Sequence, residues 1–180
     1  MGAKRSPKTV PDAYVMQPFR VTLKYHGRTF RGADLEVGYD ELEATTQEQP
    51  DFQMSDEVLR VFTALSLPEP APVRVQPLHH QISQKIHACT APRSDRAHDL
   101  VDLQLIVPLT EVGLVAATTR RLFRFRADHE WPPTLTAPAN WEPLYAEAAE
   151  GLDVFPTVGE AVAWLNQYVE RLDGSPTYHP

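Results

Sequence analysis

A lysine falls on the apolar face of a helical segment, and this residue is the first candidate for chemistry in the chain. At about 100° per residue, the apolar residues of segment 77–89 form one stripe, into which Lys85 falls. The stripe consists of Leu78, Ile82, Ile86 and Cys89. A lysine in such a position must extend its ammonium group to solvent, pair with an acid or hold a bound anion. The pattern alone leaves these three interpretations open.

The next helical segment, 95–107, carries an acid in the corresponding position. Asp99 projects onto the apolar face of this segment, and Arg96 lies three residues before it. A buried carboxylate needs a partner. Arg96 would make an ordinary ion pair within the helix, whereas Lys85 or a metal ion would make Asp99 part of a site. Asp102 lies on the flank and, taken alone, is expected to be a solvated acid.

Further along the chain, four arginines form a basic cluster in a protein of net charge −7: Arg120, Arg121, Arg124 and Arg126. The simpler interpretation is a solvated helix face. The functional interpretation is a ridge that contacts phosphate or RNA. With Arg28 and Arg31, this ridge would hold the acceptor end of a tRNA-like substrate.

The histidines and the cysteine carry weaker signals. His79, His80 and His87 lie on one helical segment without the i, i+4 spacing of a tight metal-binding pair, so a zinc site is disfavoured. His87 is expected to point away from Lys85. Cys89 is expected to be a small core residue rather than a nucleophile.

The elements that must position these residues follow the order hairpin first, helices after, which predicts an α+β fold. Alternating apolar and polar residues predict an N-terminal β-hairpin or small sheet, followed by a helical bundle. The expected strands are 19–25 and 29–39, with a short extended piece at 73–76; the expected helices are 57–65, 77–89, 95–107, 111–124 and 157–172. Residues 40–56 and 127–143 are expected to be turn-rich or loop-like.

We predict three parts in the chain: a flexible arm or severed linker (1–18), a strand-rich part (19–76) and a helical part (77–180) in the same compact unit. The 180 residues suit one domain, and 42% hydrophobic with 23% charged residues exclude a fully disordered chain. Neither a membrane-spanning segment nor a signal peptide is expected, which predicts a cytoplasmic protein.

Two of these motifs together resemble the AbiEii/AbiGii toxin family of nucleotidyltransferases. The first is His80-Gln-Ile-Ser-Gln-Lys-Ile-His-Ala88, similar to the family's (A/S)-(E/Q)-K-(L/I)-H-A helix. The second runs from Arg96 to Leu103 and is similar to R-x-x-D-(L/Y)-x-D-L. The resemblance covers about residues 18–172. It implies a polymerase-β-like fold, whose N-terminal strands would be a remnant of the nucleotidyltransferase core.

The resemblance also implies a reaction and its parts. A bacterial toxin–antitoxin or phage-defence protein would transfer a nucleotide from an NTP, with Mg²⁺, to an RNA (tRNA-like) or protein acceptor, and a cognate antitoxin would be a partner. Lys85 would contact phosphates as a point charge. Asp99 would orient Lys85 or act on the acceptor hydroxyl, and Arg96 would position Asp99 or contact a phosphate. Asp102 would pack against these residues and help to position them.

One motif of the family is missing from this sequence. The family's Gly-Ser turn and following Asp-x-Asp strand, which cradle phosphate and bind the metal, have no counterpart here. Asp34-Leu-Glu36 has the right alternation but matches a later strand, where Glu36 would be a third metal-binding carboxylate. The chain is therefore expected to be part of a longer enzyme or a short form, weakly active unless the aspartates are supplied. The alternative function is a non-catalytic binding module derived from this fold.

Overall fold

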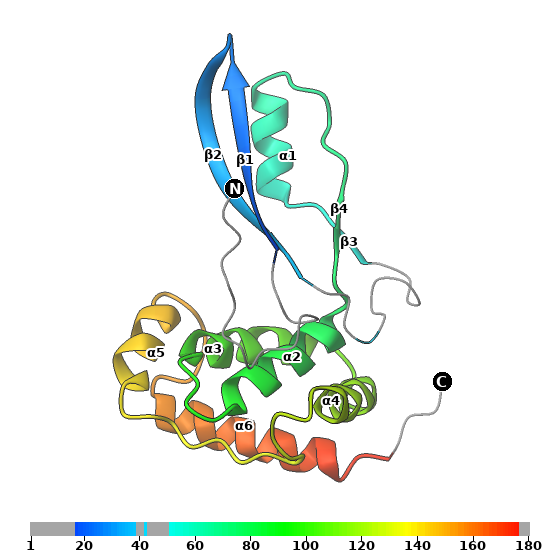
Figure 1. The fold of residues 1–180 in the computed structure, drawn as a ribbon, viewed down its shortest axis with the longest axis vertical. Coiled ribbons are helices and arrows are strands. Elements are labelled where there is room, and N and C mark those ends of the chain that lie inside the picture. The colour runs from blue at the N-terminus through cyan, green and yellow to red at the C-terminus, as the bar shows by residue number, and fades with distance from the viewer. Residues whose placement is uncertain (1–16, 39–41, 43–50, 177–180) are drawn as a thin grey trace. The chain divides into compact units, whose positions relative to one another are not determined.

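The structure, a computed structural model, describes residues 17–38, 42 and 51–176. It divides into two compact units, Met1–Glu41 and Leu42–Pro180, which are described separately here. A β-hairpin precedes a series of helices, which confirms the predicted α+β class (Figure 1). The predicted arm at 1–18 lies almost wholly outside the described residues. The finer division into 19–76 and 77–180 stays a prediction.

The described part of the first unit is an antiparallel hairpin. Strand β1 (Gln17–Tyr25) pairs with β2 (Arg28–Val37), and both residues of the connecting turn, His26 and Gly27, have positive φ. Apolar side chains alternate along β1 as the sequence predicts, yet the large ones stay at least 47% exposed. The predicted end of the second strand at 39 falls outside the described residues.

The second unit begins with short elements. Strand β3 (Asp51–Gln53) pairs with β4 (Val73–Val75). Helix α1 (Asp56–Ala64) lies between them in sequence and is capped by Ser55, whose hydroxyl accepts the N–H of Glu57 at 3.2 Å. The expectation of a turn-rich stretch was wrong at β3, because its three residues are extended by pairing with β4 rather than by any local pattern.

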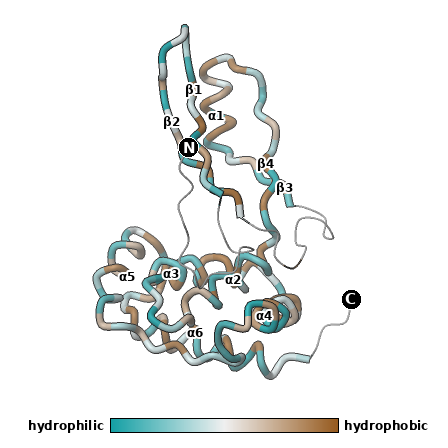
Figure 2. Tube along the Cα trace, viewed as in Figure 1, coloured by the Kyte–Doolittle hydropathy of each residue, from teal (hydrophilic) through white to brown (hydrophobic). Residues whose placement is uncertain are grey.

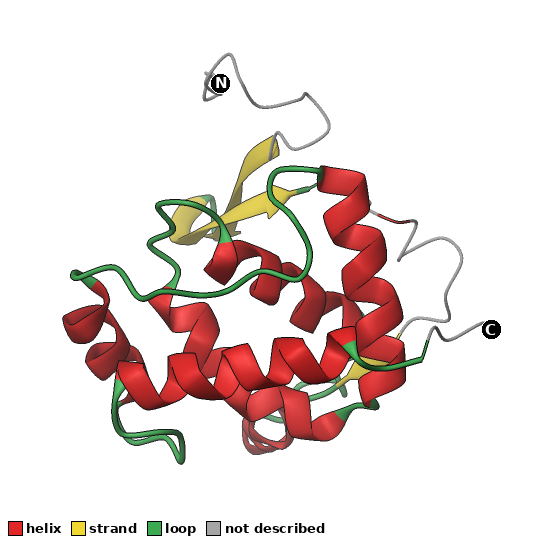
Figure 3. Cartoon of the chain, turned by 90° about the horizontal axis from the view of Figure 1, so that it is seen from below, coloured by secondary structure: helices red, strands yellow, loops and turns green. Residues whose placement is uncertain are grey.

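Five α-helices form the rest of this unit: α2 (Leu78–Thr90), α3 (Ala97–Ile106), α4 (Val112–Arg126), α5 (Trp141–Ala149) and α6 (Val158–Asp173). A short 3₁₀ helix, η3 (Val107–Leu109), follows α3. Helix α2 packs against α3 and α4, and α6 contacts α3, α4 and α5. Figures 1 and 3 show α6 running along one side of the other helices.

Helix α5 corrects the prediction of a loop over 127–143. The prolines suggested a break, but Pro143 lies in the first turn of α5, where a missing N–H costs no hydrogen bond. Trp141 begins the helix fully buried, and its indole nitrogen donates to the backbone oxygen of Ser94 at 3.0 Å. A tertiary contact that local sequence does not reveal therefore anchors this helix.

The core of the second unit lies among α2 to α6. The apolar positions predicted for the last helix are buried except Val162, which is half-buried: Val158, Ala161, Leu165, Val169 and Leu172. Its predicted cap is present, since the Thr157 hydroxyl accepts the N–H of Glu160 at 3.3 Å. Figure 2 shows apolar and polar positions interleaved along these helices. Among the described residues, no helix is long and apolar enough to cross a membrane.

Candidate functional site

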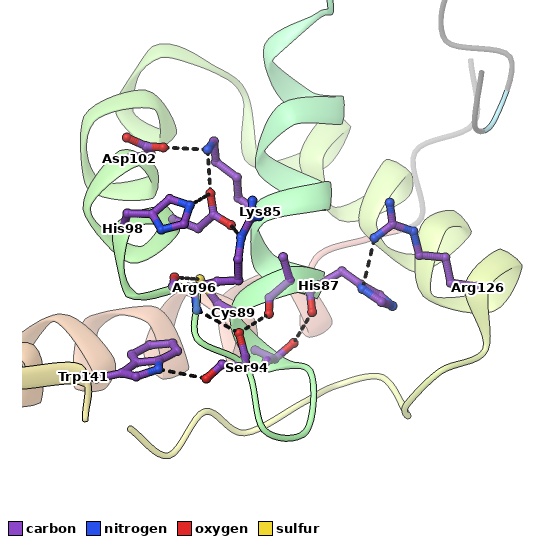
Figure 4. A network of polar contacts seen from close by, with 12 residues as sticks. Lys85, His87, Cys89, Ser94, Arg96, His98, Asp102, Arg126 and Trp141 are labelled. Carbon is purple, nitrogen blue, oxygen red and sulfur yellow. Dashed lines mark hydrogen bonds and ion pairs between the residues drawn. The ribbon is translucent and has the colours of Figure 1, made fainter. Parts of the chain in front are cut away.

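The predicted lysine and carboxylates meet where α2 packs against α3 (Figure 4). Lys85 Nζ lies 2.7 Å from Asp99 Oδ1 and 2.6 Å from Asp102 Oδ2. Arg96 Nε donates to the second oxygen of Asp99, Oδ2, at 2.6 Å. We call these four residues the Lys85 cluster. The structure thus combines both partners that the sequence left open for Asp99, the arginine of its own helix and the lysine of the neighbouring one.

Helical geometry explains this convergence. Asp99 is on the buried side of α3 and its side chain is fully buried. Lys85 interrupts the apolar stripe of α2, so its stem lies in the interface while its side chain retains 24% exposure. Asp102 is one turn after Asp99 on α3 and is 46% exposed. Asp102 therefore remains partly solvated, as considered from the sequence, and in addition pairs with the lysine of α2.

The cluster holds Lys85, Asp99 and Arg96 in their charged forms. Burial opposes charge on Lys85, but hydrogen bonds to Asp102 and Asp99 outweigh it and raise the pKa of the lysine. Burial likewise favours protonation of Asp99, yet hydrogen bonds from Arg96 and Lys85 outweigh it and lower the pKa of this carboxyl. The hydrogen bond to Asp99 raises the pKa of Arg96. Asp99 is consequently a fixed anion and a poor proton acceptor at neutral pH.

A cavity of about 620 Å³ opens beside the cluster and is lined by Lys85, Arg96 and Asp99. Arg126 at the end of α4 also lines it. Three cations and one carboxylate line the cavity, so its lining carries a positive charge in a chain of net charge −7. Such a cavity attracts anionic groups.

Sequence reasoning missed several polar residues that line this cavity. Gln81 and Gln84 lie on α2, Gln81 one turn before Lys85 and Gln84 directly before it, and Gln81 Nε2 donates to the backbone oxygen of Gln76 at 2.6 Å. The periodicity that identified Lys85 also identifies positions 81 and 88, four residues before it and three after it, as its neighbours. Arg126 was assigned to the basic ridge, and no local signal places it at this cavity.

The structure separates the predicted arginine ridge. Arg120 turns toward α6, where its Nη2 donates to the backbone oxygens of Leu172, Asp173 and Ser175 at 2.7, 2.8 and 3.0 Å. This arginine satisfies carbonyls at the end of a helix, a structural role that the sequence did not suggest. Arg121 and Arg124 remain exposed. Phosphate contact stays a prediction for all three residues.

The described residues do not fit a Mg²⁺ site. Both oxygens of Asp99 accept hydrogen bonds from cations, and Asp102 is paired with Lys85. Nowhere in the described ranges do three or more histidine, cysteine, aspartate or glutamate side chains gather to hold a metal ion. Glu36, the predicted third carboxylate, belongs to the hairpin unit, so its metal role stays a prediction.

The histidines and Cys89 contribute to packing. His87 is 4% exposed, and its ring contacts those of Phe123 and His129, with centroids 4.9 and 4.6 Å away. Cys89 is 1% exposed, and burial raises the pKa of its thiol, so the thiolate needed for nucleophilic attack is suppressed. Cys89 is accordingly a core residue, as the sequence predicts.

Fold and site together define an α+β protein with a lysine–carboxylate cluster beside a positively charged cavity. The family model described as nucleotidyl transferase AbiEii toxin, type IV TA system, matches residues 3–165. The chain belongs to this family, which confirms the resemblance found in the sequence and gives the protein a nucleotidyltransferase-like role of the toxin–antitoxin kind. A comparison with curated proteins found no match.

Proposed function

We propose that this protein transfers a nucleotide from an NTP to an RNA of tRNA type or to a protein acceptor, as the toxin of a bacterial phage-defence system with a cognate antitoxin. The observation that carries the proposal is the ammonium of Lys85, held by two carboxylates beside a cavity of nucleotide-compatible volume. Since NTP is the substrate, the protein acts in the cytoplasm.

The donor inventory of Lys85 supports a phosphate contact. An ammonium group has three N–H donors. Two of them are directed to Asp99 and Asp102, which leaves the third for a phosphate oxygen in the cavity. In nucleotidyl transfer, the acceptor hydroxyl oxygen forms a bond to the α-phosphorus while the bond to the pyrophosphate oxygen breaks. A cation fixed before the reaction stabilises the charge that develops on these oxygens.

The other members of the cluster position this lysine. Asp99 is buried with both oxygens occupied, so the geometry favours orientation of Lys85 and Arg96 over contact with the acceptor hydroxyl. Arg96 uses only its Nε for Asp99 and, with a 48% exposed side chain that lines the cavity, has further donors for a phosphate. Asp102 accepts a second hydrogen bond from the Lys85 ammonium and so helps to fix its position.

Mg²⁺ remains part of the proposal only as an ion that enters with the NTP, because the described residues do not supply its ligands. The remaining ligands would have to come from groups other than those described here. We therefore assign the described residues to phosphate binding and orientation.

Incubation of the full chain with labelled NTPs, Mg²⁺ and total tRNA tests this function. We expect label on an acceptor, and a loss of about 100-fold in Lys85→Ala, the magnitude typical for removing one charge-stabilising donor. Lys24→Ala, which removes a lysine from the hairpin, is the matched control and should leave labelling unchanged. Labelling that survives in Lys85→Ala, with both variants folded by circular dichroism, would contradict the role of Lys85.

One observation favours the alternative of a non-catalytic binding module. Lys85 and Asp99 neutralise each other, as a purely structural pair in a helix interface would. In that case the wild-type protein would transfer no label with any NTP, whereas a cognate antitoxin would still bind it. Pull-down of the antitoxin together with the labelling assay separates the two functions.

A further inference from the structure

A second cavity, of about 630 Å³, is formed by other residues of the helical unit. It lies between the end of α3, the start of α4, the segment 153–156 and α6, and it shares no lining residue with the cavity at Lys85. Its volume is in the range of pockets for small organic ligands. Neither the Lys85 cluster nor the family's reaction accounts for it.

An exposed phenylalanine forms one wall of this cavity and is rigidly held. The backbone N–H of Phe155 donates to Gln104 Oε1 at 2.8 Å, and its backbone oxygen accepts from the Tyr145 hydroxyl at 2.6 Å. Gln104 Nε2 in turn donates to the Tyr145 oxygen at 3.1 Å, which closes the network. Two hydrogen bonds thus fix the backbone of Phe155, which is 40% exposed, and a third joins its two partners. This arrangement is typical of a binding residue whose position is set in advance.

The other wall is an aromatic stack on α6. The rings of Trp164 and Tyr168 are parallel within 3°, with centroids 5.9 Å apart, and the ring of Trp164 lies 6.3 Å from that of Phe155. Tyr168 is buried, so Trp164 and Phe155 present the accessible ring surface. A flat, aromatic ligand would stack on this corner.

Two opposite charges also line the cavity. Asp153 and Arg171 are both exposed, and the structure shows no ion pair between them. The guanidinium of Arg171 lies over the Tyr168 ring, with 5.2 Å from Cζ to the centroid. A ligand that suits the cavity therefore combines a flat ring, N–H donors for a carboxylate and an anionic group for a guanidinium.

We propose that this cavity binds a nucleotide through its base. The base stacks on one of the two rings, Phe155 or Trp164, and contacts the other at its edge, because these rings are inclined by 44°. Its ring or exocyclic N–H groups donate to Asp153, and the phosphate contacts Arg171. Aromatic side chains, arginine and a carboxylate at the edge of the base are the usual means of recognising unpaired bases. The base belongs to a free nucleotide or to single-stranded RNA. The RNA case rests on the proposed function, in which RNA is the acceptor of the transferred nucleotide.

Calorimetric titration of the full chain, without NTP or Mg²⁺, tests this cavity. The probes are AMP, GMP, CMP and UMP, a single-stranded oligoribonucleotide, and the same sequence as a duplex. We expect saturable binding of at least one mononucleotide. A single strand that binds more tightly than the mononucleotide identifies RNA as the ligand, and equal affinities identify the free nucleotide. The duplex, whose bases are stacked internally, should bind at least tenfold more weakly than the single strand.

Variants locate the binding. Phe155→Ala and Trp164→Ala should each weaken it by roughly fivefold to 100-fold, the usual effect of losing one stacking partner, and Phe155→Tyr should retain it. Phe52→Ala removes another exposed phenylalanine, in β3, and should have no effect. Loss of labelling in Lys85→Ala tests the proposed function, whereas loss of binding in Phe155→Ala and Trp164→Ala tests this cavity, so the two failures are distinguishable.

Three results would overturn the proposal. The first is the absence of saturable binding by any mononucleotide or single strand. The second is unchanged affinity in both Phe155→Ala and Trp164→Ala. The third is saturable binding of free tryptophan or phenylalanine without binding of any nucleotide, which would make this an amino-acid pocket. Thermal unfolding of each variant shows whether a loss of binding reflects a loss of fold.

Discussion

Lys85 and His87 lie two residues apart on α2, and both side chains enter the helical unit, yet they accommodate burial in opposite ways. Lys85 stays charged because two carboxylates of α3 accept its donors. His87 meets Arg126, whose Nη1 donates to His87 Nδ1 at 3.1 Å. Burial, Arg126 and His129 lower the pKa of His87 to about 3. The comparison shows that the groups on the facing helix, rather than depth alone, decide the charge state of a buried group.

Among the substitutions that test this comparison, removal of the buried carboxylate of Asp99 should lower the free energy of unfolding most. Asp99→Ala leaves Lys85 and Arg96 without their shared buried partner, so we expect the free energy of unfolding to fall by about 3–5 kcal/mol. Urea denaturation measures this change. Asp102→Ala is the matched control, and because Asp102 is 46% exposed it should cost only about 1 kcal/mol or less. Equal losses in the two variants would contradict the distinction between buried and exposed carboxylates of the cluster.

The histidine side of the comparison predicts a pH dependence. The pKa of His87 is about 3 in the folded protein and near 6.5 when unfolded, so between these values the unfolded chain binds more protons. Stability should therefore fall as pH decreases from about 6.5, by up to about 1.4 kcal/mol per pH unit from this residue. His129 adds to the slope, because burial lowers its pKa as well.

Asp99 affects stability in a separate, lower pH range. Because its pKa is lowered in the folded protein, its contribution to the free energy of unfolding is present above about pH 4 and is lost as the pH falls below that value.

A substitution isolates the contribution of His87. In His87→Gln, the free energy of unfolding should decline less steeply between pH 6.5 and 4.5 than in the wild type. His26→Gln, in the exposed turn of the hairpin, is the control and should retain the wild-type slope. Chemical denaturation at a series of pH values provides the measurement. A wild-type slope in His87→Gln would show that this histidine is not held neutral.

The same comparison shows how far sequence alone reaches. Helical periodicity placed Lys85 and Asp99 on apolar faces, because spacing within a helix is a local property. It could not choose between Arg96 and Lys85 as the partner of Asp99, because that choice depends on the packing of α2 against α3. Helix α5 was missed for a related reason: its anchor, the contact of Trp141 with Ser94, is tertiary.

The second cavity is the feature that the sequence predicts least. Phe155 and Trp164 are nine residues apart and carry no motif, and the network that fixes Phe155 brings in Gln104 and Tyr145 from two other helices. Residues assembled from several elements leave no pattern in a single sequence. The positively charged side of the Lys85 cavity was likewise hidden, since Arg126 reaches it from the end of α4.

Arg120 extends the comparison, because it is a charged side chain whose partners are neutral backbone groups. Its Nη2 donates to three backbone oxygens at the end of α6, so its charge is stabilised by carbonyl dipoles instead of carboxylates. We expect Arg120→Ala to lower the free energy of unfolding by about 1–2 kcal/mol, less than Asp99→Ala, because the freed carbonyls lie near a helix end where water can replace the guanidinium. Arg121→Ala, next to it but exposed, should change stability by no more than about 0.5 kcal/mol. Equal effects in the two arginine variants, measured by urea denaturation, would restore the simpler interpretation of a uniformly solvated arginine ridge.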